Sequence, residues 1–97
     1  MGLIVVVGLL QVELTIPSAD SLKAKRMVLR SLKDRIRKNF DVSVAEVGDN
    51  DQWQSAVLAV AMVSNDRRFA NQVLSKTVDF IERSRDLVVE DYQLGFY

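Results

Sequence analysis

The stretch Ser21–Gly48, SLKAKRMVLRSLKDRIRKNFDVSVAEVG, decides the fold of this 97-residue chain. Its first twenty residues carry apolar and basic positions at helical spacing, and DVSVAEV (41–47) then alternates with the period of a strand. The polar residues Ser18, Asp20 and Ser21 are competent N-caps, so we expect the helix to begin near Asp20 or Ser21. The stretch therefore predicts one long helix that passes directly into a β-strand and a turn at 48–51.

The expected helix has an apolar stripe and a basic stripe. The apolar stripe, which we expect to pack on a sheet, consists of Leu22, Val28, Leu29, Leu32 and Ile36. The basic stripe follows one flank and consists of Lys23, Arg26, Arg30, Lys33 and Arg37. Lys25 is the exception, because it projects from the apolar side; we expect its stem along the core edge and its amine in water. We expect Asp34 to pair with Lys38 or Arg30.

Charge is strongly segregated along a chain whose net charge is zero. Residues 21–40 contain eight Lys or Arg and one acid, for a net charge of +7, so the remaining residues carry −7. The basic stripe and Lys25 are therefore the candidate site for nucleic acid or an acidic partner. The five stripe residues span about 21 Å of helix, a length that could follow phosphates along a groove. The alternative is a solvated basic face.

The segments on either side of this stretch predict three further strands and a second helix. In strand 3–16 we expect Ile4, Val6, Leu10, Val12, Leu14 and Ile16 on the core face and Leu3, Val5, Val7 and Leu9 on the opposite face. Strand 55–64 is apolar on both parities. The helix 66–85, capped by Ser64 or Asn65, has the expected inner face Phe69, Val73, Thr77, Phe80 and Ile81. In strand 87–96 one parity comprises Val88, Glu90, Tyr92, Leu94 and Phe96.

The element order is β-α-β-β-α-β. Because βαβ connections are right-handed and the turn near 48–54 is short, the simplest arrangement is an α+β ferredoxin-like sandwich. It has a four-stranded antiparallel sheet with two helices on one face, in a single domain of residues 1–97. Strands 3–16 and 55–64 are then central, and Val5, Val7 and Leu9 lie on the uncovered face. We expect a homodimer to bury this face.

Several short sequence motifs resemble those of the YlxP-like family, a small bacterial family of undefined biochemical function. They are SLKxKR from Ser21, NFxVSVAEV from Asn39, WQxAV from Trp53 and VSND from Val63, and the resemblance covers nearly the whole chain. It implies a ferredoxin-like fold. It also implies genes that often lie beside those of transcription and translation factors, including a ribosome-binding factor. It implies no known activity.

The composition argues against several classes of protein. Cys and His are both absent, which removes the nucleophilic thiol, the neutral-pH imidazole base and the commonest metal ligands. We therefore expect no enzyme, no cofactor and no metal site. The short apolar segment near residue 3 lacks a basic flank, which argues against a signal peptide or membrane span and favours a cytoplasmic protein.

Four expectations remain for partners and single residues. The central strands contain no aromatic residue, which argues strongly against base stacking on the sheet, so a structured RNA or ribosomal particle would have to bind the basic helix. The other hypothesis is a structural or protein-interaction homodimer. We expect Glu46 to pair with the basic helix or lie at an interface, and Trp53 to close the end of the sheet as a packing residue.

Overall fold

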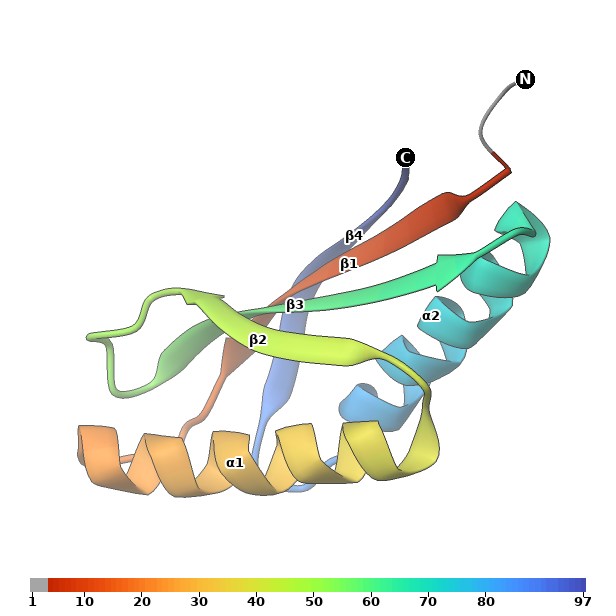
Figure 1. Ribbon diagram of the computed structural model, residues 1–97. Helices are drawn as coiled ribbons and strands as arrows, with labels where there is room; N and C mark the ends of the chain where they lie inside the picture. Colours follow the sequence, from red (N-terminus) through yellow and green to blue (C-terminus); the bar gives the residue numbers. More distant parts are fainter. Residues whose placement is uncertain (1–3) are drawn as a thin grey trace.

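The computed structural model describes residues 4–97 and shows the expected element order (Figure 1). The elements are β1 (Val6–Thr15), α1 (Leu22–Asn39), β2 (Ser43–Gly48), β3 (Ser55–Ser64), α2 (Arg67–Glu82) and β4 (Val88–Phe96). The strands pair antiparallel in the order β2-β3-β1-β4, so β1 and β3 are central and the other two form the edges. The ferredoxin-like α+β fold is confirmed.

The core lies between one face of the sheet and both helices. Its buried residues alternate along β1 as predicted, and they alternate along β3 as well. The strands and helices contribute Leu10, Val12, Leu14, Leu58, Val60, Leu29, Leu32, Ile36, Leu74, Val78 and Ile81. The first strand is shorter than predicted, because pairing starts at Val6. Ile4 was therefore wrongly assigned to the core and is 81% exposed. Leu3 lies outside the described residues.

The face that α2 presents to the sheet is rotated from the predicted one but retains Thr77 and Ile81. Its N-cap is Asp66, whose carboxylate accepts hydrogen bonds from the backbone N–H groups of Arg68 and Phe69. The buried residues are Ala70, Leu74, Thr77, Val78 and Ile81. Phe69 was wrongly placed inside and is 52% exposed. The reason lies in β1: Gly8 has no side chain, so Leu74 and Ala70 of α2 approach its Cα closely and set the rotation of the helix.

A β-bulge in each edge strand corrects the predicted parities. In β4 the register with β1 shifts between Asp91 and Val89, so Val88 lies opposite Thr15 on the uncovered face rather than with Leu94 and Phe96. In β2 the register with β3 shifts between Glu46 and Gly48. Such a bulge adds one residue to one strand and redirects the side chains beyond it.

On each edge strand a charged side chain forms a hydrogen bond with a backbone group. On β2, the Arg37 guanidinium donates to the carbonyl of Val44 at 3.0 Å. On β4, the Asp91 carboxylate accepts from the backbone N–H of Tyr92 at 2.8 Å. The Val7–Tyr97 hydrogen-bonded pair fixes the alternation of the β1–β4 ladder, so the Tyr92 N–H points away from β1. Both contacts therefore hinder the addition of a foreign strand.

We predict that Gly8→Ala lowers the free energy of unfolding by about 1–3 kcal/mol, because a β-carbon there would lie 2.8 Å from Leu74 Cδ1. In a Leu74→Ala background the same change fills space instead of overpacking it, so it should be neutral or stabilising. Urea unfolding of the two single variants and the double variant measures both effects. Equal destabilisation by Gly8→Ala in the two backgrounds would contradict this packing.

Candidate nucleic-acid interface

The basic face of α1 is largely exposed. Lys23, Arg26, Arg30 and Arg37 are exposed and Lys33 is half-buried, as expected for a flank of the helix. Arg35 and Lys38, which the predicted stripe does not contain, are also exposed and extend the positive surface toward the C-terminal end of α1. The described residues contain two ion pairs. Of the Lys and Arg residues on α1, only Lys25 and Arg37 take part in them. Most of the positive charge on α1 is therefore not neutralised within the chain.

Lys25 corrects the sequence prediction. It is 1% exposed, and its ammonium is not in water. Its Nζ lies 2.9 Å from Glu46 Oε2, 2.6 Å from the carbonyl oxygen of Asp49 and 2.7 Å from that of Gln52. The Lys25 ammonium thus donates hydrogen bonds to the two carbonyls and forms an ion pair with Glu46. Lys25 therefore joins the first turn of α1 to β2 and the β2–β3 turn, and it does not belong to the binding surface.

Glu46 pairs with α1, one of the two alternatives that the sequence left open. It lies opposite Leu58 of β3, on the face of the sheet that the helices cover, and is 17% exposed. Within residues 4–97, the ammonium of Lys25 is the only partner found for its buried Oε2. The ion pair thus compensates two charges that would each be costly to bury alone.

The side chain of Arg37 is engaged in contacts within the chain. Besides its bond to Val44, its guanidinium lies 3.6 Å from Asp34 Oδ1, so the predicted pairing of Asp34 with Lys38 or Arg30 is wrong. Both side chains are largely exposed, and the pair contributes little to stability. The residues best placed to meet a partner are then Lys23, Arg26, Arg30, Lys33, Arg35 and Lys38.

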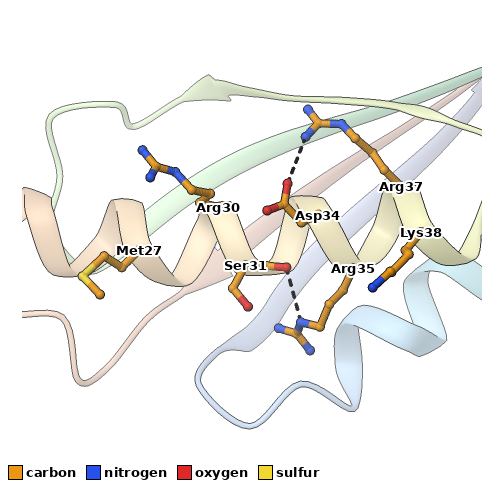
Figure 2. Close-up of a pocket in the computed structure, with 7 residues that line it drawn as sticks. All are labelled: Met27, Arg30, Ser31, Asp34, Arg35, Arg37 and Lys38. Carbon is orange, nitrogen blue, oxygen red and sulfur yellow. Dashed lines mark hydrogen bonds and ion pairs between the residues drawn. The ribbon is translucent and has the colours of Figure 1, made fainter.

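Figure 2 shows the outward surface of α1. Arg30 and Arg37 extend toward β2, whereas Arg35 and Lys38 extend from the opposite side of the helix. These residues line a shallow depression of about 740 Å³ together with Met27, Ser31 and Asp34. Because every lining residue comes from one helix, the depression has no opposing wall. It suits an extended polyanion better than an enclosed small molecule.

The uncovered face of the sheet carries the second set of predicted site residues. Val5 and Val7 are 45% and 39% exposed, and Leu9 is half-buried. Val63 of β3 lies opposite Val7 and is 69% exposed, which extends the apolar surface across two strands. Farther along β1, Gln11 and Glu13 on the same face are exposed and polar. The apolar surface that Val5, Val7 and Val63 form therefore does not continue along β1 beyond Leu9.

Trp53 does not close the end of the sheet, as the sequence predicted, because its side chain is 53% exposed. It follows the turn that Lys25 holds. The sequence gives no local signal that Lys25 holds this turn, because its acceptors there, the carbonyls of Asp49 and Gln52, are backbone groups.

Comparisons with known proteins place this chain among proteins without a defined biochemical role. A family model described as "Protein of unknown function (DUF503)" matches residues 7–94. The uncharacterized protein YlxP of Bacillus subtilis (strain 168) is 36% identical over 76 residues, which cover 78% of this chain and 83% of the relative. Neither helix in residues 4–97 is both long enough and apolar enough to cross a bilayer.

We predict that Lys25→Met lowers the free energy of unfolding by about 3–5 kcal/mol, because it leaves the Glu46 carboxylate and two carbonyls without their donor. Lys23→Met removes the same charge from an exposed position of the same turn and should change stability by less than about 0.5 kcal/mol. Urea unfolding compares the two. In Lys25→Met/Glu46→Leu the loss should be smaller than in Lys25→Met alone; an equal loss would contradict the role of the ion pair.

Proposed function

The chain belongs to the DUF503 family of proteins of unknown function, and we propose that it is an accessory protein that binds structured RNA or ribosomal particles through α1. The observation that carries this proposal is the surplus of exposed cations on one helix. Lys23, Arg26 and Arg30 are exposed and have no ion-pair partner within the described part of the chain. Cations that contribute nothing to the fold are free to neutralise phosphates.

The length and shape of the surface favour an extended polyanion. The 18 residues of α1 cover about 27 Å at 1.5 Å per residue, and the basic side chains are distributed over most of that length. Phosphate contacts of this kind give affinity that depends on salt and little on sequence. The gene neighbours that the family resemblance implies, which include a ribosome-binding factor, are consistent with a role near RNA.

We propose a binding role and not a catalytic one. The chain has neither Cys nor His, and the acid closest to the basic face, Asp34, is exposed and paired with Arg37. An exposed carboxylate paired with an arginine lacks the environment that tunes a general acid or base.

The first test is a salt titration with a labelled structured RNA. If Lys23, Arg26, Arg30 and Lys33 contact phosphates, the logarithm of the association constant should fall with the logarithm of salt with a slope of about −3 to −4. Lys23→Glu/Arg30→Glu should reduce that slope by about 2 and weaken binding strongly. The double variant Arg83→Glu/Arg85→Glu, which makes the same change in net charge beyond α2, is the matched control. An association constant that does not change with salt, or equal losses of affinity in the two double variants, would contradict the proposal.

A homodimer through the uncovered sheet face is a second candidate, because apolar side chains of two adjacent strands are exposed there together. Val7 and Val63 lie opposite each other, and Val5 extends the same surface. Contiguous apolar surface of this kind is typical of an interface. A twofold axis would place the same surface on both subunits, so that each apolar patch covers the other.

We predict a dimer at tens of micromolar protein in light scattering, and a monomer for Val7→Lys/Val63→Lys, because two buried like charges in each subunit would oppose association. The two substitutions alter neither the core nor Asp66, the N-cap of α2, so circular dichroism should show an intact fold. A monomer for the unmodified chain at that concentration would remove this candidate and leave the RNA proposal unaffected.

A further inference from the structure

The β2–β3 turn presents Trp53 on a backbone that is fixed on both sides. Before Trp53, the carbonyl of Gln52 accepts from the buried Lys25 ammonium at 2.7 Å. After it, the carbonyl of Gln54 accepts from the backbone N–H of Ile16 at 2.8 Å. The Gln54 side chain also donates to the carbonyls of Pro17 and Ala19 at 3.0 and 3.3 Å. An aromatic ring that is half exposed on a fixed backbone loses little entropy when a ligand contacts it.

The surroundings of the ring form a shallow pocket of about 320 Å³, lined by Asp51, Gln52, Trp53 and Gln54. The Nε2 group of Gln54 is already bound to two carbonyls, so the group left for a ligand is its Oε1 acceptor. Asp51 is exposed and adds a carboxylate. The pocket therefore offers an aromatic face and mostly hydrogen-bond acceptors.

We propose that this pocket, the Trp53 pocket, binds an arginine side chain of a basic protein segment. A guanidinium is planar, carries five N–H donors and stacks on aromatic rings, which matches a Trp face beside a carboxylate. The chain already contains one such contact, since the Arg67 guanidinium lies 5.0 Å from the ring centroid of Phe96. The same pocket opposes a nucleotide, because the carboxylate of Asp51 repels phosphates.

Lys25 of α1 contacts this turn, but its charge is buried and paired with Glu46, so it does not repel a cation at the Trp53 pocket. The Trp53 pocket thus lies beside the positive helix but has the opposite chemical preference. It does not depend on RNA binding by α1, and its test contains no RNA in the decisive titration.

Fluorescence gives a direct test, because Trp53 is the only tryptophan of the chain. The probe is an unlabelled peptide of alternating Arg and Gly, and its control is the same peptide with neutral citrulline in place of each Arg. The Arg peptide should quench or shift the Trp53 emission in a saturable way, and the citrulline peptide should not. Equal responses to the two peptides, or no response to the Arg peptide up to millimolar concentration, would overturn the proposal.

Variants separate the pocket from general attraction between opposite charges. With a fluorescein-labelled Arg peptide followed by anisotropy, Trp53→Leu and Asp51→Asn should each weaken binding about threefold, and Trp53→Phe should retain most of it. Glu90→Gln, which removes one exposed acid on β4, is the matched control and should leave binding unchanged. Equal losses in Asp51→Asn and Glu90→Gln would refute a specific pocket. A single-stranded oligonucleotide that quenches Trp53 more strongly than the Arg peptide would assign the ring to nucleic acid instead.

Discussion

The buried ammonium of Lys25 is the contact on which the arrangement of the rest depends. It joins the first turn of α1 to Glu46 on β2 and to two carbonyls of the β2–β3 turn. A charge buried in this way is tolerated only when its donors all find acceptors, so the contact imposes one geometry rather than a range. That geometry places the basic flank of α1 beside β2 and holds the backbone of Trp53.

The basic segment of the sequence is not a uniform positive surface in the structure. Lys25 is used within the core, Arg37 is used at the edge of β2, and the remaining cations line the flank and outer face of α1. The acids are distributed more widely, and two of them lie in the turn beside Trp53. The chain therefore carries an exposed basic helix and an acidic turn next to each other. If the two proposed binding roles hold, a particle that contains both phosphates and basic protein segments offers ligands for both.

The sequence predicts those features of this fold that depend on local periodicity. The alternation Leu10, Val12, Leu14 is confirmed, because burial of one face imposes a period of two. The 55–64 strand is confirmed as well, and its signal was an apolar run rather than a period. The bulges in β2 and β4, the rotation of α2 on Gly8 and the carbonyl partners of Lys25 were missed. Each depends on a contact between distant segments, and the carbonyls that bind Lys25 exist at every residue and leave no mark in the sequence. Lys25 was noticeable only because it lay on the wrong side of the helix.

The central position of β1 has a consequence for the synthesis of the chain. This apolar strand pairs only with β3 and β4, so no strand partner exists until residues 55–64 have been made. The delay covers about forty residues, or about 2–8 s at 5–20 residues per second. Throughout that time its backbone groups and apolar side chains are open to other contacts, and its second edge stays open until the last residues of β4 arrive. Of the four strands, β1 is therefore synthesised before the others and is the last to have both of its edges paired.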